Sequence, residues 1–317
     1  MNKKLDINAD MFSKKSLNML PLFILNDDLF MNGWIYNHYI KLTICKDGIS
    51  FSDNDFFLNE GVFIRTSSCF PIGTMNTVGI SKDLLLKTLK GLIDDEQYLT
   101  GIFDKEQLQL NNSITTDNEL PFLIYGYDEE EQYFLAIIFI NRQYEKINIP
   151  FDKICKSVLA KVNGVADGRI LINSYGRNYF FQKTIDMAKI LIEIKDFLKN
   201  SNGNDIDGVK NYINNRISND LVDDYLLTSA NTVLDHITFM YDRLKYIFRL
   251  MKQDIRISTL SNEIMDLISE LKKTINSLNI NIKLSENDKI YYTQKFADVF
   301  NKEKDILYEI CLNLSEQ

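Results

Sequence analysis

Six side chains in this sequence have the chemistry for nucleophilic catalysis, four cysteines and two histidines: Cys45, Cys69, Cys155, Cys311, His38 and His236. A cysteine acts as a nucleophile when an imidazole lies within hydrogen-bond reach and a third group orients that imidazole. His38 and Cys45 are the closest pair in the sequence, yet on one helix they would stand about 10 Å apart along its axis, and farther apart on a strand. His38 and Cys45 therefore cannot form a catalytic dyad on one helix or strand, although they are close in the sequence.

The surroundings of each group suggest different roles. Cys69 lies in the polar stretch RTSSCFPIG and is the thiol expected to be most accessible. Cys155 and Cys311 are expected to be small apolar fillers. His236 falls on an apolar helical stripe, where a packed residue with a polar tip is the ordinary interpretation, and His38 is expected to be a surface or supporting residue.

Other kinds of site are excluded by missing motifs. Two histidines and no CxxC pair leave no zinc cluster, and no metal site is predicted. The sequence has no Walker loop, GxGxxG, GxSxG or HExxH, so no cofactor is predicted. The acidic runs 94–96 and 128–131 are interpreted as solvated turns, because carboxylates crowded together favour water.

Charge and hydropathy limit the partners and the compartment. With 36 basic and 44 acidic side chains, the net charge is −8, which repels phosphate backbones and argues against nucleic acid. The longest apolar runs, such as 134–140, are too short to cross a bilayer, so no membrane association is expected. Residues 1–15 do not resemble a signal peptide. The four widely spaced cysteines are expected to be free thiols, which is typical of a protein in the reducing cytoplasm.

The prolines divide the chain. All four, Pro21, Pro71, Pro121 and Pro150, precede residue 151, and proline disrupts helix interiors. We therefore expect a mixed α/β half over 1–155 and a half over 156–317 that is helical to its end. A fragment of residues 156–317 should then give a helical circular dichroism spectrum, with marginal stability if its apolar face normally packs on the first half.

The first half combines strands with helices. Runs at 120–127, 132–140 and 145–149, separated by short polar turns, predict an antiparallel β-meander. Residues 82–93 have the period of an amphipathic helix. Residues 31–45 (MNGWIYNHYIKLTIC) are ambiguous by period, and their length favours a buried helix.

The second half shows three apolar stripes at helical spacing. The first includes Leu234, Ile237, Met240, Leu244, Ile247, Phe248 and Met251. The second is Leu260, Ile264, Leu267, Leu271, Ile275 and Leu278. A last helix opens after Ser285, a good N-cap, and contains Phe296, Val299, Phe300, Leu307 and Ile310. Such stripes predict a helical bundle.

One segment resembles a known family. Residues 120–154, LPFLIYGYDEEEQYFLAIIFINRQYEKINIPFDKI, resemble the butirosin-acyltransferase-like branch of the papain-like cysteine protease fold, in which a strand ends in GYD, a hairpin and second strand follow, and an I-x-F/Y segment opens a helix. Upstream, GWIYNHYIKL lies where that family has its nucleophile helix. Downstream, LDHITFMYDRLKYI resembles the helical segment of related proteins found beside nonribosomal peptide pathways.

This resemblance implies an α+β fold with a papain-like first half, followed by the helical bundle. Active members take an acyl group as a thioester from a carrier protein onto a cysteine and pass it to an amine. Here the nucleophile position falls at Gly33-Trp34 and the histidine position on residues 120–122, while Asn141 matches the orienting residue. The first hypothesis is therefore a member of a carrier-protein-dependent natural-product pathway with a degenerate site, acting as a scaffold or acyl-handling protein.

The alternative hypothesis is an active amide-forming acyltransferase. Its thiol would come from Cys45 or Cys69, and folding would bring His38 or His236 to it as the base. A homodimer is compatible with either hypothesis.

Binding an acidic carrier protein would require a locally basic surface on this acidic chain. Lys245, Arg249, Lys252 and Arg256 are spaced four, three and four residues apart, which would place them on one face of a helix. The sequence therefore predicts a docking stripe there, with an ordinary solvated helix face as the alternative.

Overall fold

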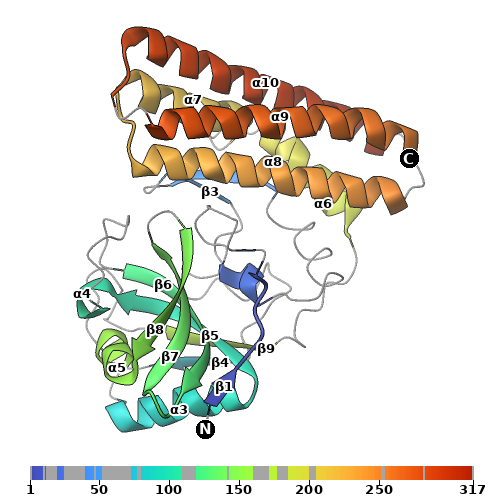
Figure 1. Ribbon diagram of the computed structural model, residues 1–317. Coiled ribbons are helices and arrows are strands. Elements are labelled where there is room, and N and C mark those ends of the chain that lie inside the picture. Colours follow the sequence, from blue (N-terminus) through green and yellow to red (C-terminus); the bar gives the residue numbers. More distant parts are fainter. Residues whose placement is uncertain are drawn as a thin grey trace. The chain divides into compact units, whose positions relative to one another are not determined.

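The computed structural model describes residues 2–9, 11, 20–24, 40–45, 48–51, 73–76, 80–108, 119–140, 143–159, 171–176, 185–199, 205–250, 254–280 and 283–315. Contacts divide the chain into two compact units (Figure 1). The described residues of unit 1 lie within 2–24 and 73–176, and those of unit 2 within 40–51 and 185–315. The protein is thus α+β, with an antiparallel sheet in the first half and a mainly helical second half.

Unit 1 is built on an antiparallel sheet with the order β4-β9-β5-β6-β7-β8, in which β1 pairs with the end of β6. The strands are β1 (Asn2–Lys4), β4 (Gly73–Asn76), β5 (Gln97–Asp104), β6 (Glu119–Asp128), β7 (Tyr133–Ile140), β8 (Gln143–Pro150) and β9 (Leu171–Gly176). The predicted meander is confirmed as β6-β7-β8, because each run pairs with the next across a short turn.

Helices α3 (Lys82–Asp94) and α5 (Phe151–Leu159) pack against this sheet, beside the short helix α4 (Lys105–Leu108). The 3₁₀ helix η2 (Leu20–Phe23) contacts the sheet through Phe23, whose ring lies 5.1 Å from that of Tyr144 on β8. The predicted helix over 82–93 is confirmed. It begins at the N-cap Ser81, whose hydroxyl accepts the Leu84 N–H, and it buries Leu85, Leu89 and Ile93 four residues apart. The aromatic ring of Phe151 packs 4.7 Å from that of Phe134, which fixes α5 at the start of β7.

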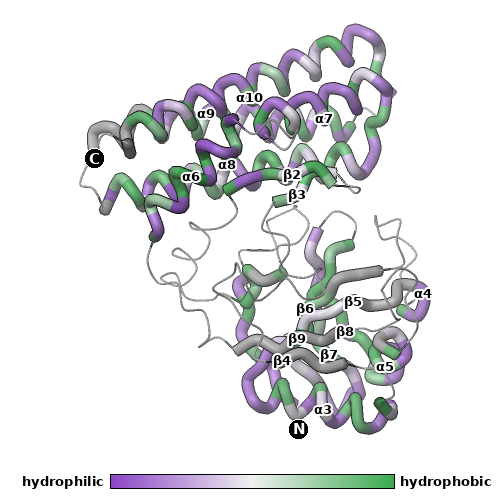
Figure 2. Tube along the Cα trace, turned by 180° about the vertical axis from the view of Figure 1, so that it is seen from behind, coloured by the Kyte–Doolittle hydropathy of each residue, from purple (hydrophilic) through white to green (hydrophobic). Residues whose placement is uncertain are grey.

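Unit 2 contains α6 (Met187–Lys199), α7 (Ile206–Ser218), α8 (Asp224–Leu250), α9 (Asp254–Ile280) and α10 (Glu286–Ser315). Helices α7, α8, α9 and α10 pack in a ring, with α6 against α10 and α7. Hydrophilic and hydrophobic residues are interspersed along these helices, as expected for amphipathic helices (Figure 2). The apolar residues of the predicted stripes of α9 and α10 are all buried. Ser285 caps α10 as predicted, since its hydroxyl accepts the Asp288 N–H.

Residues 42–51 also belong to unit 2, where β2 (Leu42–Cys45) and β3 (Gly48–Phe51) form an antiparallel hairpin packed on α8. The predicted helix over 31–45 is therefore wrong for residues 42–45, and residues 31–39 lie outside the described part. Gly48 has φ 119°, a conformation that suits a hairpin turn and disfavours other residues. The apolar run before it has too little periodicity to distinguish a strand from a helix.

The expectation of helix throughout residues 156–317 is wrong at β9. This strand pairs with β5 and β4, so residues 171–176 complete the sheet of unit 1. Missing prolines favoured helix after residue 155, but a central strand also avoids proline, because it must donate its backbone N–H groups.

Candidate functional site

Three of the four cysteines lie among the described residues. Cys45 is exposed at the end of β2, and its thiol donates a hydrogen bond to the Gly48 carbonyl oxygen at 3.1 Å. Cys155 and Cys311 are buried, as predicted, and this desolvation raises the pKa of both thiols. A raised pKa lowers the thiolate fraction at neutral pH, so neither buried thiol is an activated nucleophile.

His236 lies on α8 in the interior of unit 2, and its side chain is fully buried. Its Nε2 lies 2.7 Å from the Ile40 carbonyl oxygen, and its Nδ1 lies 2.8 Å from Oε1 of Glu303 on α10. The Glu303 side chain is only 4% exposed. Both ring nitrogens are therefore occupied by internal partners, which confirms the interpretation of His236 as a packed residue.

These contacts bear on the predicted pairing of a cysteine nucleophile with a histidine base. The thiol of Cys45 is directed at Gly48 and the imidazole of His236 at Ile40 and Glu303, so this arrangement does not pair them as nucleophile and base. Cys69, His38 and Asn141 lie outside the described residues, and their roles stay predictions.

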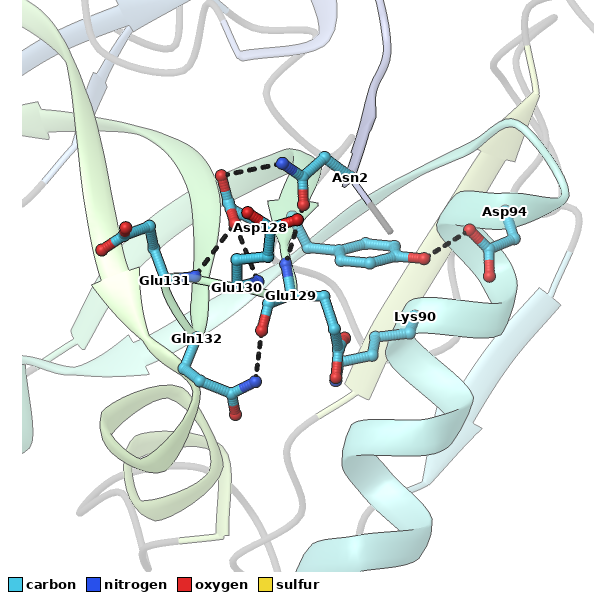
Figure 3. Close-up of polar contacts among 9 residues, drawn as sticks. Asn2, Lys90, Asp94, Asp128, Glu129, Glu130, Glu131 and Gln132 are labelled. Carbon is cyan, nitrogen blue, oxygen red and sulfur yellow. Dashed lines mark hydrogen bonds and ion pairs between the residues drawn. The ribbon is translucent and has the colours of Figure 1, made fainter.

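The GYD segment of the resemblance has structural roles in unit 1, and Figure 3 shows the polar contacts of its Asp128. A Cβ on Gly126 would lie 2.6 Å from the Lys3 carbonyl oxygen, so the close approach of β1 requires glycine. The Asp128 carboxylate accepts the N–H groups of Glu130 and Glu131 at 3.0 Å, and its other oxygen accepts the Asn2 amide at 3.2 Å. These bonds close the β6–β7 turn and hold β1 against it.

Tyr127 joins the same strand to α3. Its hydroxyl donates to Asp94 at 2.7 Å, and desolvation together with this hydrogen bond raises the pKa of Tyr127 to about 12. On the preceding turn of α3, the Lys90 ammonium lies 2.6 Å from the Glu129 carboxylate, and this contact lowers the pKa of that carboxyl. The same ammonium lies 4.1 Å from the Phe151 ring centroid. Glu129 thus forms an ion pair with Lys90, whereas the acidic run 128–131 was predicted to be a solvated turn.

The predicted basic stripe is not on one helix. Lys245 and Arg249 lie on α8, which ends at Leu250, whereas Arg256 lies in the first turns of α9. Lys252 is outside the described residues. A single helix from 224 to 280 would be about 85 Å long, and the antiparallel packing of α8 on α9 instead lets their apolar stripes face each other. Only Lys245 and Arg249, four residues apart on α8, share a helix face.

Sequence reasoning missed the pairing of His236 with Glu303. A signal was present, because Glu303 lies between Val299 and Leu307 at spacings of four residues, on the buried stripe of α10. One ionisable residue on the apolar stripe of each of two helices indicates that the two are paired inside the bundle.

Two further features concern sites and membranes. Within the described residues, no group of three or more histidine, cysteine, aspartate or glutamate side chains is arranged to hold a metal ion. None of the described helices is both long enough and apolar enough to cross a bilayer.

A scan against protein-family models, a search of curated proteins and a search of solved structures each found no match for the chain.

Proposed function

We propose that this chain is a non-catalytic member of a carrier-protein-dependent natural-product pathway, a cytoplasmic protein with a papain-like first half that binds an acyl or peptidyl carrier protein. The resemblance of residues 120–154 supports the family and pathway. The observation that favours a binding role over catalysis is the internal use of His236, whose two ring nitrogens face Ile40 and Glu303.

Acyl transfer by the papain chemistry needs a thiolate beside an accessible imidazole. The Cys155 and Cys311 thiols are buried with raised pKa values, and Cys45 is bonded to its own hairpin. The family's nucleophile and histidine positions fall on Gly33-Trp34 and on residues 120–122, which supply neither group. A protein that keeps the fold without the dyad can still present a surface to the carrier.

The docking surface in this proposal is centred on Lys245 and Arg249 of α8. Arg249 is exposed, and the half-buried Lys245 places its ammonium 5.8 Å from the ring centroid of Tyr241. A net charge of −8 repels an acidic partner in general, so the proposal places the partner's approach at a locally basic surface, here Lys245 and Arg249.

Charge reversal tests this surface. The double variant Lys245→Glu/Arg249→Glu should bind a phosphopantetheinylated carrier protein at least about tenfold more weakly at low salt, with a flatter salt dependence. The matched control is Lys272→Glu/Lys273→Glu, two exposed lysines on α9, which should change affinity less than about twofold. Calorimetry on the full chain measures both, and equal effects in the two variants would remove α8 as the docking surface.

Thiol labelling and acyl transfer test the absence of catalysis. With iodoacetamide near neutral pH, Cys45 should react at the rate of an ordinary thiol, and Cys155 and Cys311 more slowly still. Incubation with an acyl-loaded carrier should leave no acyl group on the protein by mass spectrometry. A fast-reacting Cys69 whose rate is lost in His38→Ala would contradict the non-catalytic role and favour the acyltransferase alternative.

A further inference from the structure

The contact between His236 and Glu303 contains an ionisable pair inside a helical bundle. The side chains are 0% and 4% exposed, and Nδ1 lies 2.8 Å from Oε1. Neither atom completes a well-aligned hydrogen bond within the described part of the chain. Burying such groups is costly unless their charges or hydrogen bonds are compensated.

The hydrogen bond to Ile40 determines where the protons lie. A carbonyl oxygen only accepts, so the Nε2 of His236 must carry a proton. A bare Nδ1 facing a carboxylate oxygen at 2.8 Å would bring two lone pairs together. The contact therefore contains a second proton, either on an imidazolium or on a neutral carboxylic acid.

The poor alignment favours the charged form. A neutral carboxylic acid would stabilise Nδ1 only through a directed O–H···N bond, whereas the attraction between imidazolium and carboxylate depends weakly on angle. The faces of the imidazole are apolar, since Phe51 of β3 and Phe197 of α6 lie 6.1 and 5.3 Å away between ring centroids. Low polarity around a pair strengthens its Coulomb attraction.

The pair holds the segment at residues 40–51 as well as the two helices. Ile40, two residues before β2, accepts the His236 proton, and the Ile49 N–H at the other strand donates to Ser229 of α8 at 2.9 Å. Phe51 packs on Phe239 and His236. His236 is thus the point where the hairpin, α8 and α10 meet.

We infer that the His236–Glu303 ion pair is a latch that fastens the β2–β3 hairpin to the helices of unit 2. Loss of either charge leaves the other group buried and unpaired, and local opening at Ile40 relieves this by admitting water. The helices should remain folded, because the buried side chains of α9 and most of those of α10 are apolar residues that pack without the pair.

Amide hydrogen exchange on the full chain tests this inference. In Glu303→Gln, the amides of residues 42–51 should exchange at least about tenfold faster than in the wild type near neutral pH, while those of α9 remain within about twofold. The control Glu270→Gln removes an ion-paired carboxylate on α9 instead and should leave the hairpin within about twofold. Unchanged hairpin exchange in Glu303→Gln would overturn the latch.

One measurement on the wild type guards against a variant that fails to fold. Nitrogen chemical shifts of His236 near neutral pH should show both ring nitrogens protonated, and a neutral ring would overturn the inference.

Discussion

Gly48 and Gly91 both lack a side chain, but this absence has opposite consequences for stability at the two positions. Gly48 has φ 119°, and a Cβ there would lie 2.5 Å from the Ser229 hydroxyl oxygen. Gly91 lies within α3, and a Cβ there would meet no atom within 4 Å. The first glycine is required by the hairpin and its contact with α8, whereas the second only weakens a helix.

Substitution by alanine should separate the two. Gly48→Ala is expected to lower the free energy of unfolding by roughly 1–3 kcal/mol, because the left-handed backbone is strained and Ser229 must move. Gly91→Ala should raise it by about 0.5–1 kcal/mol through helix propensity. Urea unfolding measures both, and a stabilising Gly48→Ala would contradict the positive φ.

At the scale of elements, α9 and α10 are joined by one carboxylate between two lysines. Glu270 of α9 lies 3.1 Å from the ammonium of Lys295 and 3.0 Å from that of Lys302, both on α10. These hydrogen bonds, first Lys302 and then Lys295, hold the Glu270 pKa below its usual range. The two partners thus connect the helices over two turns.

A depressed pKa in the folded state makes the contribution of Glu270 depend on pH. The stabilisation is complete above the ordinary glutamate pKa and is lost as the pH falls through the lower folded value. Glu270→Gln should therefore reduce the free energy of unfolding at pH 7 by about 0.5–1 kcal/mol, and by almost nothing near pH 2. Urea titrations at the two pH values test this, with the exposed Glu263→Gln of α9 as control. An equal loss at both values would exclude the ion pairs as the cause.

In the whole molecule, each of the two units is assembled from segments that are not contiguous in the sequence. Residues 171–176 complete the sheet of unit 1, and residues 42–51 pack in unit 2. A division of the chain at residue 155 therefore separates the hairpin from the bundle that it covers. The fragment of residues 156–317 lacks the side chains of Leu42, Ile49 and Phe51, which are at most 1% exposed.

This loss should exceed what the fragment can tolerate. Three buried apolar side chains contribute roughly 5–8 kcal/mol, comparable with the stability of a whole domain. The fragment of residues 156–317 should keep helical circular dichroism but unfold without a cooperative transition and bind a hydrophobic dye. Fusing residues 32–54 to residues 184–317 through a flexible linker should restore a cooperative thermal transition. Equally cooperative melting of both fragments would show that the hairpin is dispensable.

The sequence alone determined those parts of the protein whose burial has a regular period. The helix at 82–93, the meander from β6 to β8, the buried stripe of α9 and the cap at Ser285 could all be predicted, because helix and strand periods of 3.6 and 2 residues are local properties. The burial of Cys155, Cys311 and His236 followed in the same way from their neighbours. The predicted sites at Cys69, His38 and Asn141 lie outside the described residues and stay predictions.

Only the tertiary structure decided which buried faces meet. Periodicity shows that Glu303 and His236 lie on apolar stripes, but not that these stripes face each other, and it cannot place β9 beside β5 or the hairpin of Gly48 on α8. The basic stripe failed for the same reason, since α8 ends at Leu250 and its spacing no longer describes one surface. A local pattern indicates whether each residue is buried or exposed. It does not determine which distant residues meet, because a contact over 67 residues, as between His236 and Glu303, depends on the burial and charge balance of the completed fold.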